Sequence, residues 1–142
     1  MKQERHEYVE LLVVDDELLI RDLLFDFFTA QGYKTHLAEN GKQAMKMIES
    51  ISIQTALVDL KMPEIDGIEL TTFMAKKMPQ VPIIVMTAFP SLDSAIEAIR
   101  CGVYDYVVKP FNITELHGTV KKAVEEYKSR MAGGYKPISA NG

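Results

Sequence analysis

The chain has 142 residues, a net charge of −4, 47% hydrophobic and 25% charged residues, which fits one globular domain and excludes a disordered tract or long coiled coil. The acidic balance argues against direct nucleic-acid binding, and Cys101, as the only cysteine, has no intramolecular disulfide partner. Residues 1–10 show no signal-peptide pattern and no apolar run could span a bilayer, so we expect a cytoplasmic protein that does not enter the membrane.

Five short apolar runs, each bounded by polar or turn residues, predict five β-strands. In chain order the runs cover residues 9–14, 33–38, 55–58, 82–86 and 104–108. The run at 33–38 is the weakest, and we place it at an edge of the sheet. Because most of the others are continuously apolar rather than alternating, we expect a parallel sheet that is covered on both faces.

Stretches with apolar residues three or four positions apart lie between the strands and predict helices. These helices cover residues 17–30, 41–50, 67–77 and 92–100, followed by a last helix from the N-cap Asn112 through Tyr127. In the first helix we expect an inward face of Leu19, Leu23, Phe27 and Ala30. In the fourth helix we expect an inward face of Ala95, Ile96 and Ile99.

The strand–helix unit repeats five times, which predicts a doubly wound α/β fold with a five-stranded parallel sheet. We expect an N-terminal extension over residues 1–8 and a single folded domain over residues 9–129. Residues 130–142 include two adjacent glycines and a proline, and we expect them to form a linker or a disordered tail.

Polar side chains stand where the predicted strands end, and the set comprises Asp15, Asp16, Asp59, Thr87 and Lys109. Because the carboxyl ends of parallel strands meet at one edge of the sheet, these side chains are expected to converge there. Each has an ordinary interpretation by itself: Asp15 or Asp16 as a helix N-cap, Thr87 as a strand-end hydroxyl, Lys109 as a solvated charge. Their joint occurrence favours a functional site.

Three carboxylates held together repel one another, and a hard divalent cation such as Mg²⁺ relieves that repulsion. A magnesium site also suits phosphoryl transfer, because the metal neutralises the charge on the transferred group. Lys109 and Thr87 can contact phosphoryl oxygens as a cation and as a hydroxyl donor. Asp59 is then the candidate nucleophile, which would form an aspartyl phosphate.

The motifs VVDDE (13–17), LVDLKMP (57–63), DG (66–67), MTA (86–88) and YVVKPF (106–111) resemble those of receiver domains of bacterial two-component response regulators. The resemblance covers nearly the whole chain and implies the flavodoxin-like (CheY-like) sandwich with strand order 2-1-3-4-5. It also implies a module that catalyses its own phosphorylation and dephosphorylation but has no independent enzymatic activity.

The resemblance assigns a role to each site residue. Asp59 is the phosphoacceptor, and Mg²⁺ is held by Asp15, Asp16, Asp59 and the backbone carbonyl of Lys61. Thr87 and Lys109 contact the phosphoryl group. Thr87 and the aromatic residue Tyr106 form the switch, and the bond between Lys109 and Pro110 is expected to be cis.

The resemblance further implies a sensor histidine kinase as phosphodonor and a switch surface made by the fourth helix, fifth strand and fifth helix. This surface would control a partner or an output domain, and phosphorylation could produce a homodimer. Four apolar residues belong to this surface or, as we favour, to the core: Leu92, Ile96, Tyr104 and Val107.

Residues 87–99 are similar to receivers of enhancer-binding transcription activators. Whether the chain is a stand-alone receiver or the N-terminal part of a longer regulator stays open.

Two alternatives belong to other classes of protein. A haloacid-dehalogenase-type phosphatase also uses a nucleophilic aspartate after a strand, but it expects a second aspartate two residues later, where this chain has Lys61. A binding module that keeps the receiver fold without being phosphorylated is the other alternative. The presence of all five strand-end residues argues against it.

Overall fold

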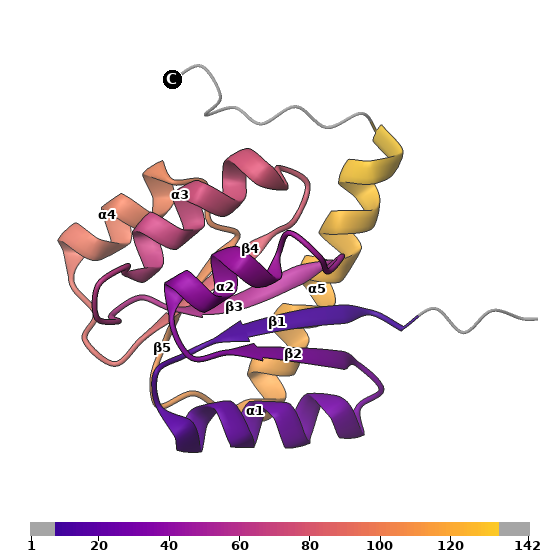
Figure 1. Ribbon diagram of the computed structural model, residues 1–142, viewed down its shortest axis with the longest axis horizontal. Coiled ribbons are helices and arrows are strands. Elements are labelled where there is room, and N and C mark those ends of the chain that lie inside the picture. Colours follow the sequence, from indigo (N-terminus) through magenta and orange to yellow (C-terminus); the bar gives the residue numbers. More distant parts are fainter. Residues whose placement is uncertain (1–7, 134–142) are drawn as a thin grey trace, which may run out of the picture.

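In the computed structural model, which describes residues 8–133, strands and helices alternate along the whole described chain (Figure 1). The strands are β1 (Glu10–Val14), β2 (Lys34–Ala38), β3 (Thr55–Asp59), β4 (Ile83–Thr87) and β5 (Asp105–Val108). The helices are α1 (Leu18–Ala30), α2 (Gly41–Met47), α3 (Gly67–Lys77), α4 (Leu92–Arg100) and α5 (Ile113–Gly133).

All strand pairs are parallel, and the order across the sheet is β2-β1-β3-β4-β5. The predicted doubly wound fold and its 2-1-3-4-5 order are therefore confirmed. Order reverses between β1 and β3, which lie side by side although β2 separates them in the chain. In such a sheet the ligand site lies beyond the carboxyl ends of the strands near this reversal.

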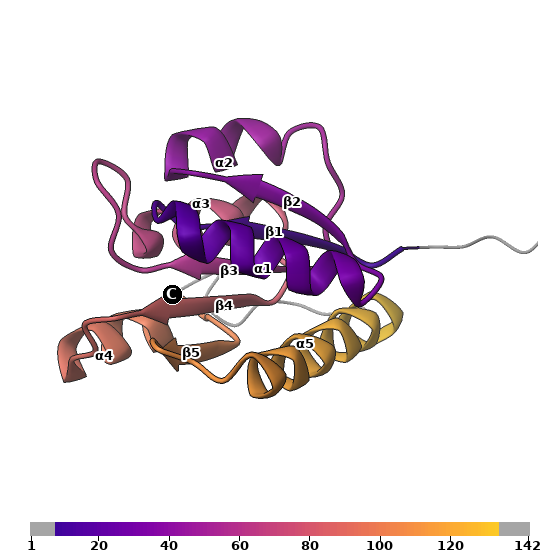
Figure 2. The same ribbon diagram turned by 90° about the horizontal axis from the view of Figure 1, so that it is seen from below.

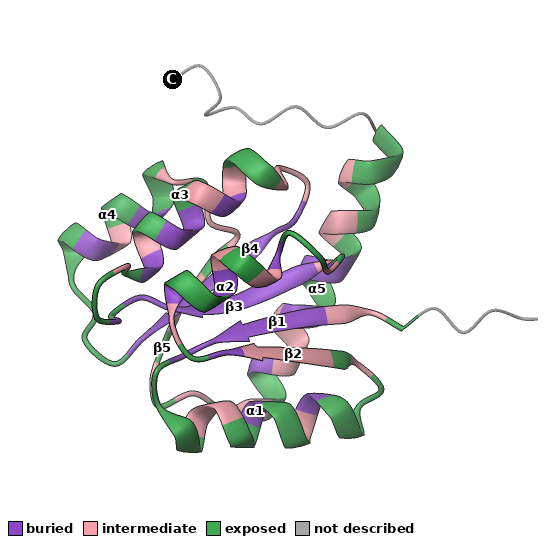
Figure 3. Ribbon diagram, viewed as in Figure 1, coloured by how far each residue is buried: buried purple, intermediate pink, exposed green. Residues whose placement is uncertain are grey.

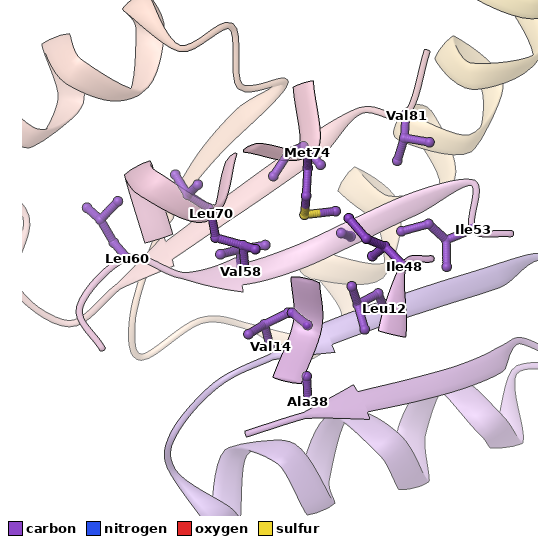
Figure 4. Packing of buried hydrophobic residues seen from close by; sticks show 14 of the residues in the cluster. Leu12, Val14, Ala38, Ile48, Ile53, Val58, Leu60, Leu70, Met74 and Val81 are labelled. Atoms are coloured by element: carbon purple, nitrogen blue, oxygen red, sulfur yellow. The ribbon is translucent and has the colours of Figure 1, made fainter. Parts of the chain in front are cut away.

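Helices pack on both sides of the sheet (Figure 2). Two apolar clusters lie between the sheet and these helices, one on each face. The first joins alternate residues of β1, β3 and β4 to α2, α3 and α4, and Figure 4 shows its packing around Val58, Leu70 and Met74. The second joins the intervening strand residues to α1 and α5, with Phe28 and Val120 among its members. Because successive strand residues point to opposite faces, both faces of the inner strands are apolar.

Burial follows the order of the strands (Figure 3). Every residue of β3 and β4 is buried, whereas the edge strands β2 and β5 are mostly half-buried or exposed. This is the reason that the sequence pattern of β2 is weak and that of β3 is continuous. The inner strands therefore provide the rigid support on which the strand-end residues stand.

The predicted inward face of α1 was wrong at Leu19 and Leu23, whose side chains are exposed. The helix instead buries Leu24 and Phe28, which belong to the cluster shared with α5. Apolar residues occupy most positions of α1, so more than one stripe has helical spacing, and packing against the sheet selects the stripe that carries Phe28.

The predicted inward face of α4 was wrong as well. Ser94 and Ala98 are buried, whereas Ile99 is 72% exposed and Ile96 is 38% exposed. Because the inward stripe carries only small side chains, hydrophobicity alone selects the opposite stripe. Leu92 is also exposed, at 76%, so its favoured assignment to the core was wrong too.

The last helix begins as predicted, since the Asn112 side chain accepts hydrogen bonds from the backbone N–H groups of Thr114 and Glu115 at 2.9 and 3.0 Å. It continues to Gly133, so its final turn lies in the segment assigned to a linker or tail. Residues 134–142 of that segment, and residues 1–7 of the expected N-terminal extension, lie outside the described residues. None of the helices within residues 8–133 is long and apolar enough to cross a bilayer.

Gly67 begins α3 at a point where the helix touches the end of β3. A Cβ atom at Gly67 would lie 2.5 Å from the carbonyl oxygen of Asp59 and 2.7 Å from the Cα of Leu60. These are backbone atoms, so the clash could be relieved only by moving the strand end or the helix. The glycine thus permits the close contact between α3 and the segment that carries Asp59.

We predict that Gly67→Ala lowers the free energy of unfolding by about 1–3 kcal/mol, because overpacking of this kind forces a backbone shift. Urea denaturation followed by circular dichroism measures the change. Gly118→Ala on α5 is the matched control, since nothing lies within 4 Å of a Cβ there. The control should leave stability unchanged or raise it by up to about 1 kcal/mol. Equal effects of the two substitutions would contradict the account.

Candidate functional site

Main-chain hydrogen bonds fix the strand-end residues at one level of the sheet. The backbone N–H of Asp15 donates to Ala38, that of Leu60 to Met86, and that of Lys109 to Thr87, over 2.7–3.2 Å. The hydrogen-bond ladders of β1, β3 and β5 therefore continue one residue beyond the ends of these strands. In Figure 1 the arrowheads of β1 and β3 point to this same edge. The predicted convergence of Asp15, Asp59, Thr87 and Lys109 is consistent with this register.

The ammonium group of Lys109 is the centre of the charged contacts. Its Nζ lies 2.7 Å from Asp15 Oδ2, 3.2 Å from Glu17 Oε1 and 3.6 Å from Asp59 Oδ1. Asp15 is fully buried and Asp59 is only 5% exposed. Charges removed from water need partners of opposite sign, and Lys109 is the cation shared by both buried aspartates.

Burial, followed by the charge of Asp15, raises the pKa of Asp59 from its ordinary value near 3.8 to about 7, although the charge of Lys109 opposes the rise. Asp16 contributes to the increase through a hydrogen bond and its charge. Burial by itself would lower the pKa of Lys109, but the neighbouring Asp15, Asp59 and Glu17 raise it overall. Three carboxylates face one ammonium group, which leaves an excess of negative charge beside Asp59.

The donor atoms present fit a hard cation. Carboxylate oxygens of Asp15, Glu17 and Asp59 lie within 4.8 Å of one another. All are oxygen donors of the type that Mg²⁺ prefers, and their uncompensated charge favours a divalent ion. A cavity of about 300 Å³ opens beside them, with room for a small anion and water. It is lined by Asp16, Glu17, Asp59, Lys61, Ala88, Phe89 and Lys109.

The structure places the predicted metal ligands unequally. Asp15 and Asp59 are buried and adjacent to Lys109, whereas Asp16 is exposed at the rim of the cavity and Lys61 lies beside it. Glu17 joins the oxygen cluster although the sequence reasoning assigned it no role. Its only signal was its place as the third consecutive acid after β1.

The interpretation of Asp15 or Asp16 as a plain helix cap does not describe the start of α1, whose N-cap residue is Glu17. Asp15 Oδ1 does accept a hydrogen bond from the backbone N–H of Glu17 at 2.9 Å, while Oδ2 pairs with Lys109. Arg21 adds a cation on the main-chain side, because its Nη1 donates to the carbonyl oxygen of Asp15 at 2.8 Å. Asp15 is thus held from three directions.

The two predicted switch residues are both engaged in hydrogen bonds. Thr87 is fully buried, and its Oγ1 accepts from the backbone N–H of Phe89 at 3.0 Å. Tyr106 on β5 is half-buried, and its hydroxyl lies 2.6 Å from Ser94 Oγ on α4. The bond between Lys109 and Pro110 is cis, as expected.

The remaining residues proposed for the switch surface fall into two groups. Leu92 and Ile96 are exposed, whereas Tyr104 and Val107 pack against the α1–α5 cluster.

With the fold and the strand-end residues described, comparison with known proteins assigns the family. The profile of the response regulator receiver domain matches residues 11–121. Because this match covers most of the chain, the chain belongs to the response regulator receiver domain family, the signalling modules of two-component systems. It is similar to the receivers of enhancer-binding activators, as the following relatives show.

Regulatory protein AtoC of Escherichia coli (strain K12) is 41% identical over 115 residues, which are 81% of this chain and 25% of AtoC. Transcriptional regulatory protein ZraR of Klebsiella oxytoca is 36% identical over 118 residues, 83% of this chain and 27% of ZraR. The chain thus spans about a quarter of these relatives. Response regulator TrrA of Thermotoga maritima, solved with Mg²⁺ and BeF, is 37% identical with a TM-score of 0.74, covering 81% of this chain and 98% of TrrA.

We predict that Asp59→Asn stabilises the metal-free protein, and that the gain depends on pH. An acid whose pKa is raised by folding is protonated in both the folded and the unfolded state below about pH 4. At such a pH its ionisation does not lower the free energy of unfolding. As the pH rises towards about 7, the unfolded state loses its proton first, so the folded wild type loses stability. Above this range the variant should be more stable by about 2–4 kcal/mol.

Denaturant unfolding in the presence of a chelator, repeated across this pH range, measures the difference between wild type and variant. Asp22→Asn, which replaces an exposed carboxylate on α1, is the control and should show no such pH-dependent gain. Added Mg²⁺ should reduce the difference in stability between Asp59→Asn and wild type, because the cation stabilises ionised Asp59. If the difference in free energy of unfolding between Asp59→Asn and wild type stays constant with pH, the assignment of a buried carboxylate with a raised pKa at this position is contradicted.

Proposed function

We propose that this chain accepts a phosphoryl group on Asp59 from the phosphohistidine of a sensor histidine kinase. The observation that carries the proposal is the position of Asp59: an almost fully buried carboxylate at the end of β3, 3.6 Å from Lys109 and beside a cavity that opens to solvent. A carboxylate with an adjacent fixed cation can act as a nucleophile towards phosphorus, since the cation also attracts the anionic donor.

In this reaction a carboxylate oxygen of Asp59 forms a bond to phosphorus while the bond from phosphorus to the histidine nitrogen breaks. The electron pair of the broken bond returns to the imidazole. Lys109, already within 3.6 Å of Asp59, is positioned to contact a phosphoryl oxygen. Movement of the Thr87 hydroxyl away from the backbone N–H of Phe89 would supply a further donor.

Asp15, Asp16, Asp59 and the Lys61 carbonyl are the residues proposed to hold Mg²⁺, with Glu17 as an additional nearby acid. When bound, the ion supplies positive charge that offsets the repulsion between the acids and an incoming phosphoryl group. The excess of carboxylates over cations around Asp59 supports this assignment. The Mg²⁺ and BeF complex of the similar protein TrrA supports it independently.

The consequence of phosphorylation is proposed to be a change in the surface formed by α4, β5 and α5, with Thr87 and Tyr106 as its switch. The changed surface would control a partner or an attached output domain, and it could bring two copies together as a homodimer. The relatives AtoC and ZraR extend far beyond the matched region, and the name of ZraR indicates transcriptional regulation. We therefore propose a cytoplasmic regulator that acts on transcription through another domain, not by its own contact with DNA.

Incubation with Mg²⁺ and the small phosphodonor acetyl phosphate tests the central reaction. Wild-type protein is expected to gain one acid-labile phosphoryl group by intact-protein mass spectrometry, and Asp59→Asn is expected to gain none. Chelation of Mg²⁺ should abolish the labelling of wild type. Glu64→Gln is the matched control, because Glu64 is exposed in the loop that follows β3 but lines neither the cavity nor the oxygen cluster.

Two outcomes would reject the proposal. Wild type that stays unlabelled and does not respond to beryllofluoride would favour the alternative, a receiver fold that binds partners without being phosphorylated. Labelling that persists in Asp59→Asn would place the acceptor elsewhere. A phosphatase would instead release inorganic phosphate from many phosphoesters in repeated turnovers. The sequence argues against a phosphatase, because Lys61 stands where that family expects the second aspartate.

A further inference from the structure

Helix α4 is attached to the domain through small side chains. Its buried residues are Ser94 and Ala98, whereas its large apolar side chains Leu92, Ile96 and Ile99 are all exposed. Apolar burial supplies most of the free energy that holds a helix on a sheet, and Ser94 and Ala98 bury little of it. Individual hydrogen bonds therefore have an unusually large share in fixing the position of α4.

One hydroxyl on α4 makes three such bonds. Ser94 Oγ accepts from the backbone N–H of Ser91 at 3.3 Å, donates to the carbonyl oxygen of Ser91 at 3.2 Å, and lies 2.6 Å from the Tyr106 hydroxyl. A hydroxyl has one proton and two lone pairs. Since the Ser94 proton goes to Ser91, the phenol of Tyr106 donates to Ser94. The hydrogen-bonding capacity of Ser94 is then completely used.

The partner of Ser94 belongs to the strand that leads to the charged site. Tyr106 lies on β5 three residues before Lys109, whose ammonium group pairs with Asp15. At the end of the same strand, the backbone N–H of Lys109 donates to the Thr87 carbonyl at 2.8 Å. A displacement of β5 or Thr87 that follows a change at Asp59 thus reaches Tyr106 through a short, hydrogen-bonded segment.

We propose that Ser94 is a positioning residue whose hydrogen bond to Tyr106, called here the Ser94–Tyr106 latch, holds α4 in its unphosphorylated position. Any movement of the Tyr106 ring breaks this bond and leaves Ser94 with an unused lone pair beside the first turn of α4. The helix has little apolar burial to resist a shift, so the latch sets how readily the switch surface changes. The regulatory part of this inference rests on the proposed function.

The size of the effect follows from linkage between the two states. A typical intramolecular hydrogen bond shifts a conformational equilibrium by roughly 2- to 12-fold. If the latch favours the unphosphorylated arrangement, its loss raises the population of the other arrangement by that factor. A ligand that binds the other arrangement then binds more tightly by up to the same factor.

Hydrogen–deuterium exchange of the whole chain without phosphodonor tests the latch itself. In Tyr106→Phe the amides of α4 are expected to exchange roughly 2- to 12-fold faster than in wild type, while those of α1 stay unchanged. Ser94→Ala should give the same result at α4. Tyr104→Phe is the matched control, because Tyr104 precedes β5 but packs against the α1–α5 cluster, and it should leave α4 unchanged.

Beryllofluoride titration at saturating Mg²⁺ tests the regulatory consequence. Tyr106→Phe and Ser94→Ala should each lower the apparent dissociation constant by up to about tenfold, and the double variant should gain no more than either single one. Ser91→Gly removes the Ser91 hydroxyl that accepts from the N–H of Ser94 but keeps the latch, so its affinity should match wild type within about twofold.

The outcomes separate the latch from the proposed function. Unchanged exchange of α4 in Tyr106→Phe overturns the latch whether or not the protein is phosphorylated. Faster exchange combined with unchanged or additive beryllofluoride affinities overturns its regulatory role. Wild type that binds no beryllofluoride rejects the proposed function and with it the regulatory role, while the exchange data still decide whether the Ser94–Tyr106 hydrogen bond holds α4.

Discussion

The ion pair between Lys109 and the buried carboxylate of Asp15 is the contact around which the functional edge of the sheet is organised. It joins the ends of β1 and β5, strands at separate positions in the sheet, over 2.7 Å. Asp59 lies between them on β3 with a raised pKa, since burial and Asp15 outweigh the stabilising charge of Lys109. A buried charge network with excess negative charge is costly to maintain, and binding of a cation would lower that cost.

The rest of the domain fixes the positions of these charged side chains and connects them to the surface formed by α4. The fully buried strand β3 ends at Asp59 and pairs with the fully buried β4, and Gly67 allows α3 to contact the Asp59 backbone closely. On the opposite side, β5 contains Tyr106 and is followed directly by Lys109, so it links the charged edge to the lightly packed α4. Rigid support beside the acids and weak attachment of α4 are complementary requirements of a switch.

The sequence predicted most of the sheet and the convergence of Asp15, Asp59 and Lys109 because both leave strong local signals. Continuous apolar strands identify a covered parallel sheet, and polar residues at strand ends identify a candidate functional edge. It failed for the inward faces of α1 and α4. Excess hydrophobicity left the α1 face ambiguous, and in α4 the buried stripe contains Ser94 rather than an apolar residue. The role of Ser94 depends on a contact across twelve positions, which no periodic pattern can reveal.

The most direct test of the account is to identify the residue that carries the acid-labile phosphoryl group. After phosphorylation with Mg²⁺ present, borohydride reduction converts an aspartyl phosphate to homoserine, and tandem mass spectrometry of the resulting peptides locates the change. The account predicts homoserine at position 59 alone, with no conversion when Mg²⁺ is chelated. Conversion at Asp15 or Asp16, or at a residue outside the β3 end, would contradict the claim that the charge arrangement around Lys109 selects Asp59.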